Sequence, residues 1–100
     1  MTVRFVFLAQ LKEKAGTDEV IISLKPESDD AHPTVLKALK EMELHFTDKG
    51  IRVLEGDRIR KGVVLFLRAR SGGLKRVKNP RERKLEEQQT IVIANTMEGG

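Results

Sequence analysis

The sequence predicts an α+β fold in which one main helix packs against a mixed sheet of four to five strands. Apolar strand-like runs come first, a single segment with helical periodicity follows, and further strand-like runs close the chain. Because strands and helices do not alternate along the sequence, a doubly wound parallel sheet is not expected. The chain of 100 residues suits one domain with one modest core.

The first part of the sheet is predicted from two runs near the N-terminus. Val3–Ala9 is apolar on most of both faces, and Asp18–Leu24 is rich in β-branched residues. The polar segment Gln10–Gly16 between them has room for one helical turn that ends at its glycine. So short a connection favours an antiparallel pair.

The main helix is predicted over residues 33–46. Pro33 suits the first helical position, where its missing N–H is not needed, and Gly50 marks the exit. Apolar residues recur at steps of four and three positions, which is one stripe of a helix. The stripe consists of Val35, Leu39, Met42 and Phe46, and Leu36 widens it.

Polar residues around this helix have structural interpretations, and none is assigned to catalysis. Asp29 and Asp30 precede the helix, where carboxylates favour its positive N-terminal end. We expect the N-cap among residues 30–32. His32 is interpreted as a loop residue and His45 as an exposed helix residue.

The rest of the sheet is predicted after the helix. Glu55–Arg58 is typical of a turn, and Val63–Ala69 is a nearly continuous apolar run typical of a buried strand. A basic loop follows, with a short strand expected at Leu74–Val77, and Thr90–Ala94 is the last strand. In such folds the last strand commonly lies beside the first at the centre of the sheet, which would explain why both are apolar.

Composition excludes several kinds of site. There is no cysteine, so disulfides, thiolate metal sites and a cysteine nucleophile are excluded, and the two histidines lack metal-ligand spacing. No run approaches the roughly 20 apolar residues of a membrane span, and the N-terminus lacks the features of a signal peptide. We therefore expect a cytoplasmic monomer that binds no metal or cofactor of its own.

The sequence ends in Gly99–Gly100, shortly after a strand-like run. We expect residues 1–95 to form the domain and residues 96–100 to form a flexible tail. Glycine adds no side chain and leaves φ unrestricted, so a Gly-Gly end makes a thin arm that can enter an enzyme cleft. A frayed terminus without a function is the alternative, because chain ends are often disordered.

Both ends of the chain resemble the β-grasp sulfur carriers and ubiquitin-related modifiers. The opening VRFVFLAQLKEKAGTDEVIISL is similar to the small subunit of molybdopterin synthase, with its strand, Ala-x-Leu turn, helical turn, Gly and second strand. The closing TIVIANTMEGG resembles the end of the eukaryotic ubiquitin-related modifier. The chain departs from the family where LEEQQT replaces a Gly-Asp turn before the last strand. The resemblance implies a β-grasp, ubiquitin-like fold over nearly the whole chain.

The resemblance also implies that the chain is a protein co-substrate rather than an enzyme, although it could be counted as the small subunit of molybdopterin synthase. In the family, an E1-like activating enzyme uses ATP and Mg²⁺ to adenylate the C-terminal carboxylate. The product becomes a thiocarboxylate for sulfur transfer in tRNA thiolation or molybdopterin synthesis, or an isopeptide on a lysine. On this analogy Gly100 carries the reacting carbon and Gly99 keeps the arm slim.

The partners implied by the resemblance are the activating enzyme and either the molybdopterin synthase large subunit, a tRNA thiolation enzyme or lysine-bearing target proteins. In ubiquitin-like folds an exposed sheet face beside the tail docks such partners. Four apolar residues are candidates for that face, although core packing is the favoured interpretation on grounds of burial. They are Phe5, Phe7, Leu65 and Leu67.

A basic segment, residues 68–84, supports an alternative function as a small nucleic-acid-binding or interaction module. Its cations suit phosphate contacts, but no aromatic residues are interleaved for base stacking. A solvated, partly flexible loop is the favoured interpretation, and no nucleic-acid partner is expected. The cations are Arg68, Arg70, Lys75, Arg76, Lys78, Arg81, Arg83 and Lys84.

A second Gly-Gly pair, Gly72–Gly73, follows LFLRARS and resembles the tail of ubiquitin itself. A precursor cut after Gly73 is therefore an alternative, but the cut would remove the last strand and turn a buried strand into a tail. A loop turn at this pair is the favoured interpretation.

Overall fold

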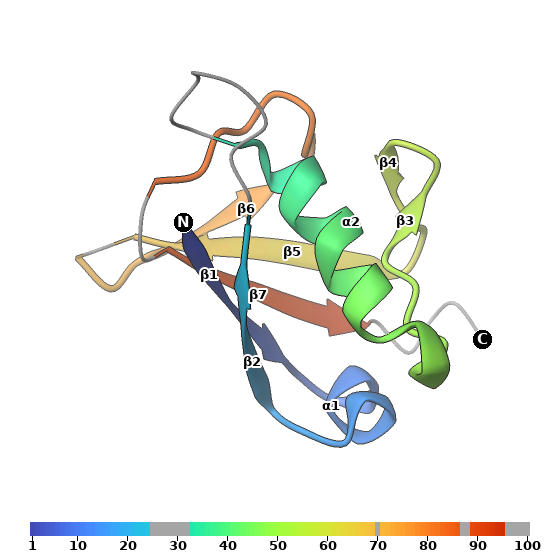
Figure 1. The fold of residues 1–100 in the computed structure, drawn as a ribbon. Helices are drawn as coiled ribbons and strands as arrows, with labels where there is room; N and C mark the ends of the chain where they lie inside the picture. The colour runs from blue at the N-terminus through green and yellow to red at the C-terminus, as the bar shows by residue number, and fades with distance from the viewer. Residues whose placement is uncertain (25–32, 70, 87–88, 96–100) are drawn as a thin grey trace.

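The computed structural model describes residues 1–24, 33–69, 71–86 and 89–95. One five-stranded sheet, in the order β2-β1-β7-β5-β6, carries the main helix α2 on one face (Figure 1). The elements are β1 (Thr2–Phe7), α1 (Gln10–Ala15), β2 (Glu19–Ser23), α2 (Val35–His45), η1 (Thr47–Lys49), β3 (Leu54–Glu55), β4 (Arg58–Ile59), β5 (Val63–Arg68), β6 (Leu74–Val77) and β7 (Thr90–Asn95). The predicted α+β class and the mixed sheet are confirmed.

The first and last strands lie together at the centre of the sheet, as expected. β1 and β7 pair in parallel, with Phe5 opposite Ile91 and Phe7 opposite Ile93. All the other pairs in this sheet are antiparallel. Figure 1 shows β1 in dark blue running beside β7 in red.

The β1–β2 hairpin contains the predicted helical turn. α1 ends at Gly16, which adopts a left-handed conformation with φ of 77° and donates its N–H to the carbonyls of Lys12 and Glu13. A residue with a Cβ is strained at such a φ, so glycine ends the helix at low cost. Leu11 and Ala15 are buried, so this turn closes one end of the core.

Helix α2 buries the predicted apolar stripe, but it begins later than the sequence suggested. The N-cap is Thr34, whose hydroxyl oxygen accepts a hydrogen bond from the Lys37 N–H at 3.2 Å. The prediction that Pro33 occupies the first helical position is therefore wrong, and so is the cap expected among residues 30–32. Threonine satisfies one of the free N–H groups of the first turn, which proline cannot do.

The core lies between α2 and the inner face of the sheet. Its centre consists of side chains that are 0–2% exposed, from both the helix and the central strands. They include Val3, Phe5, Phe7, Leu39, Met42, Leu65, Leu67, Ile91 and Ile93. Phe7 and Phe46 meet edge to face, with ring centroids 5.4 Å apart, which is a favourable aromatic geometry.

The predicted turn at Glu55–Arg58 belongs to a small separate hairpin, β3–β4. Glu43 of α2 holds this hairpin. Its Oε2 accepts hydrogen bonds from the N–H groups of Val53 at 2.7 Å and Leu54 at 2.9 Å. Bonds to an ionised acceptor are stronger than neutral ones, so one carboxylate ties the hairpin to the helix.

The internal Gly72–Gly73 pair forms the turn between β5 and β6. Gly72 has a φ of 96° and donates its N–H to Ala69, while the Ala69 N–H bonds to Gly73. β5 is paired on both sides, with β7 and with β6. The loop-turn interpretation is confirmed, because a cut after Gly73 would delete the central strand β7.

None of the helices in the described ranges combines the length and the apolar composition that crossing a membrane requires.

We expect Glu43→Ala to lower the free energy of unfolding by about 2 kcal/mol, because two buried or half-buried N–H groups lose a charged acceptor. Urea denaturation monitored by circular dichroism measures the change. Glu41→Ala is the matched control, since Glu41 lies exposed on the same helix, and it should change stability by less than about 0.5 kcal/mol. Equal losses in the two variants would contradict the role given to Glu43.

Candidate functional site

The candidate site lies where β7 ends, and two neighbouring strands pair with β7 near that point. β1 pairs with it as far as Ile93, and β5 pairs with it as far as Asn95. Beyond the end of β1, the Leu8 N–H donates to the Ile93 carbonyl at 3.0 Å. β7 is therefore hydrogen-bonded on both sides as far as Ile93 and on the β5 side as far as Asn95.

The predicted site residues Gly99 and Gly100, and the predicted tail over residues 96–100, lie outside the described residues. Their role stays a prediction. The structure describes the end of β7, which these residues follow in the sequence.

The outer face of the sheet, opposite α2, carries an apolar strip across its central strands. Val92 is 3% exposed, yet it does not belong to the main core cluster, since it lies opposite Val6 and Phe66 on the outer face. Its neighbours on this face are half-buried. We call this set the outer strip: Val6, Val64, Phe66, Val92 and Ala94.

The four docking-face candidates named from the sequence belong to the core instead. Phe5, Phe7 and Leu65 are 0% exposed and Leu67 is 2% exposed, all on the inner face beneath α2. Their assignment to core packing is confirmed, and their assignment to a docking face is wrong. The outer strip was missed because it occupies the neighbouring positions of the same strands. Side chains of a strand alternate between the two faces of the sheet. Assigning one residue of each strand to the core would therefore have placed the residues of the outer strip on the opposite face.

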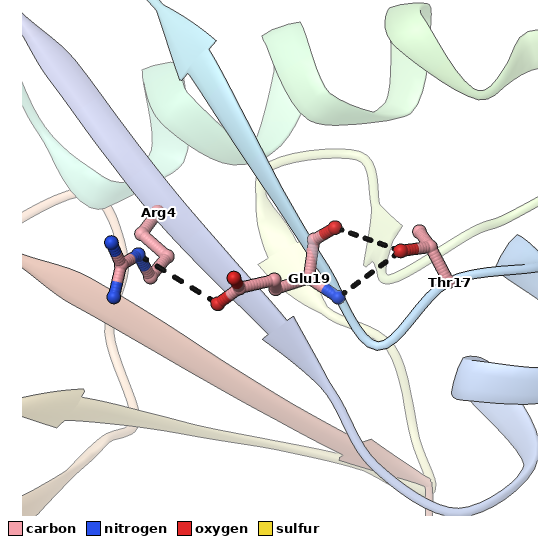
Figure 2. Close-up of polar contacts among 3 residues, drawn as sticks. All are labelled: Arg4, Thr17 and Glu19. Carbon is pink, nitrogen blue, oxygen red and sulfur yellow. Dashed lines mark hydrogen bonds and ion pairs between the residues drawn. The ribbon is translucent and has the colours of Figure 1, made fainter.

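Polar side chains border the outer face at the β1–β2 edge. Figure 2 shows Arg4 of β1 reaching Glu19 of β2, with Nε and Oε2 3.7 Å apart. Thr17 supports the start of β2, because its hydroxyl donates to the Glu19 carbonyl at 3.0 Å and accepts from the Glu19 N–H at 3.4 Å. About half of each charged side chain is exposed, so the ion pair contributes little stability and mainly sets the polarity of this border.

The histidines and acidic residues singled out from the sequence do not gather into a site. His45 is exposed at the end of α2, as expected, and its ring meets Phe46 edge-on with centroids 4.9 Å apart. His32, Asp29 and Asp30 lie outside the described residues. Within the part of the chain that the structure describes, no group of three His, Asp or Glu residues is placed to hold a metal ion.

The basic segment makes more backbone contacts than the sequence suggested. Its described cations are exposed, as expected for solvated side chains, and Arg70 lies outside the described residues. The backbone, however, forms the predicted strand β6 and then a loop that is bonded to α2. Val35 donates its N–H to Arg83, and Leu36 donates to Pro80, at 2.8 Å and 3.0 Å. The loop interpretation holds for residues 78–84, to which the structure adds these two backbone bonds, and the flexibility of the loop stays a prediction.

The chain is similar to known proteins in its structure, but no significant match is found at the level of sequence. No protein-family model matches the chain, and no curated protein matches it significantly. The crystal structure of SAMP1 from Haloferax volcanii has a TM-score of 0.74 and 16% identity, over 100% of both chains. That of H. volcanii small archaeal modifier protein 1 has a TM-score of 0.69 and 14% identity, over 96% of this chain and 98% of that one.

A third similar structure comes from Pyrococcus furiosus. It is a candidate molybdopterin converting factor, subunit 1, with a TM-score of 0.66 and 16% identity. The match covers 97% of this chain and 99% of that one. The resemblance found at the two ends of the sequence is thus confirmed for the fold as a whole. The chain has the ubiquitin-like β-grasp fold of these small modifier and converting-factor proteins.

Proposed function

We propose that the chain is a ubiquitin-like sulfur carrier or protein modifier that reacts through the carboxylate of Gly100. One observation carries this proposal: the central strand β7 is hydrogen-bonded up to Asn95, five residues before the Gly-Gly end of the sequence. Residues 96–100, which end in two glycines, would then be a short, thin arm on this domain. The names of the similar structures, a modifier and a converting factor subunit, agree with this chemistry.

The proposed chemistry takes place in a separate E1-like activating enzyme that binds ATP and Mg²⁺. The carboxylate oxygen of Gly100 attacks the α-phosphorus of ATP, which releases pyrophosphate and forms an acyl-adenylate. A persulfide sulfur then attacks the acyl carbon and expels AMP, and a thiol cleaves the resulting disulfide to leave the thiocarboxylate. In the modifier branch, a lysine amine takes the acyl group instead and forms an isopeptide.

The arm suits this task by its length and its width. Five residues after Asn95 span at most about 17 Å, which is enough to enter an enzyme cleft while the domain stays outside. Gly99 and Gly100 add no Cβ, so a narrow channel can admit them. A bulkier last residue would widen the arm at the reacting carbon.

We further propose that the outer strip docks the activating enzyme and the later acceptor. The acceptor would be the large subunit of a molybdopterin synthase, a tRNA thiolation enzyme or a lysine-bearing protein. Ala94 and Val64 are paired residues of the strip at the very end of β7. A partner bound there would therefore lie beside the base of the arm.

The central test is the intact mass of the protein after incubation with its activating enzyme, ATP and a sulfur donor. We expect a mass gain equal to the exchange of one oxygen for one sulfur, or conjugates on lysine-bearing proteins. Addition of one alanine after Gly100 should abolish both products, because the reacting carboxylate moves off the Gly-Gly end. Neither product from the unmodified chain, or equal products from the extended chain, would contradict the proposal.

The docking surface is tested by Phe66→Arg, which places a charge in the outer strip without touching the core. We expect the KM for this protein to rise about tenfold in enzyme-dependent exchange of pyrophosphate into ATP, with kcat little changed. Leu44→Arg is the matched control, since Leu44 is an apolar residue on α2 that is 69% exposed. Equal KM values for Phe66→Arg and the unmodified chain would exclude the strip as the docking surface.

A further inference from the structure

The positive charge of the molecule is concentrated in one segment. Residues 68–84 contain eight of the 19 Lys and Arg residues and only one of the 15 Asp and Glu residues, so their net charge is +7. The rest of the chain contains the other eleven basic and fourteen acidic residues, so its net charge is −3. The overall charge of +4 is therefore the sum of a strongly basic segment and an acidic remainder of the chain.

This basic segment is not neutralised by the fold. The ion pairs among described residues join Arg4 to Glu19 and Lys40 to Asp57, and none involves a described cation of residues 68–84. The segment is nevertheless held in place. Leu85 is fully buried and donates its N–H to Pro33 at 2.8 Å, which adds to the bonds that Arg83 and Pro80 accept from α2. Described cations that make no ion pair, carried on a backbone that is bonded in place, favour binding of an anion, because little backbone order has to be created on binding.

A hollow of about 270 Å³ carries further positive charge at the start of β5, the strand that pairs with the end of β7. It is formed by the turn before β5, the start of β5 and the end of β6, and no carboxylate lines it. The first residues of β5, Val63 and Val64, pair with Asn95 and Ala94. The cations that line the hollow are Arg60, Lys61, Arg76 and Lys78, and all four are exposed.

A larger hollow nearby differs in its charge. Its volume is about 850 Å³, and three cations face three carboxylates around it: Arg58, Lys78 and Arg81 with Glu55, Asp57 and Glu82. Of these two hollows, the smaller one combines several cations with no acidic residue. Arg76 belongs to β6, and Lys78 follows directly after Val77, the last residue of that strand.

We propose that the smaller hollow and the basic segment bind the phosphodiester backbone of a nucleic acid. Arginine and lysine are the side chains that bind phosphate oxygens, and arginine can do so with two parallel hydrogen bonds. The cations extend beyond the hollow along β6 and the following loop, which fits a polyanion better than a single phosphate. The inference does not depend on the proposed function, and it replaces the expectation from the sequence that the chain has no nucleic-acid partner.

A nucleic acid fits this surface better than an acidic protein. Charged residues are depleted at the core of protein–protein interfaces, whereas interfaces with nucleic acid are much more positively charged. Neither the basic segment nor the lining of the hollow contains an aromatic residue, so base stacking is not part of the recognition. Binding should therefore be independent of sequence and strongly dependent on salt.

The test measures binding of the full chain to a fluorescein-labelled RNA hairpin by fluorescence anisotropy over a series of salt concentrations. We expect the double variant Arg76→Gln, Lys78→Gln to bind about tenfold more weakly and to lower the salt slope by about 1.8, since each lost contact with a duplex phosphate removes about 0.9. A DNA hairpin of the same sequence should bind within about threefold of the RNA, because phosphates alone are contacted.

The matched control is Lys49→Gln, Arg52→Gln, which removes the same two charges from exposed residues outside the hollow. It should bind the RNA within about twofold of the unmodified chain, and thermal unfolding checks that both variants are folded. Three results would overturn the proposal. They are an unchanged affinity of the hollow variant, an equal loss in the control, and displacement of the RNA by poly-glutamate as effectively as by unlabelled RNA.

Discussion

The parallel pairing of β1 with β7 is the interaction on which the rest of the structure depends. Parallel strands cannot be joined by a tight turn, so everything between Phe7 and Thr90 has to lie outside this pair. β2 adds to one side, β5 and β6 add to the other, and α2 crosses one face (Figure 1). Because the inner side chains of β1 and β7 form the centre of the core, folding is complete only when the last strand is in place. The end of the sequence therefore follows directly from the most constrained strand.

A second constraint comes from the N-terminus of α2. The first N–H groups of a helix have no partner within the helix, and here Thr34, Arg83 and Pro80 supply three acceptors. The loop after β6 is thus bonded to the helix through its backbone. Since the carbonyls face the helix, the basic side chains of this loop are left exposed. The need to cap one helix thereby explains why the backbone of a charged segment is hydrogen-bonded to α2.

The order of the elements could be predicted from the sequence, but several contacts could not. Apolar runs and the helical stripe of Val35, Leu39, Met42 and Phe46 are local patterns, and they gave the strands, the helix and the fold class. The outer strip could not be assigned because β1 and β5 are apolar at both odd and even positions, so alternation alone did not say which residues face α2. Glu43 and the loop bonded to α2 act across long sequence separations, and no local pattern marks such contacts. The role of Gly99 and Gly100 was predicted from the sequence alone and stays a prediction, because both lie outside the described residues.

The outer strip and the cationic hollow meet at the start of β5. Val64 belongs to the outer strip and also lines the cationic hollow, while Phe66 of the strip lies opposite Arg76 of the hollow. An enzyme that covers the strip would therefore crowd a nucleic acid bound in the hollow, and the reverse also holds. Both surfaces adjoin the end of β7, so either partner would lie near the base of the arm. If both proposals are correct, activation and nucleic-acid binding would have to occur in turn, with the same arm presented first to one partner and then to the other.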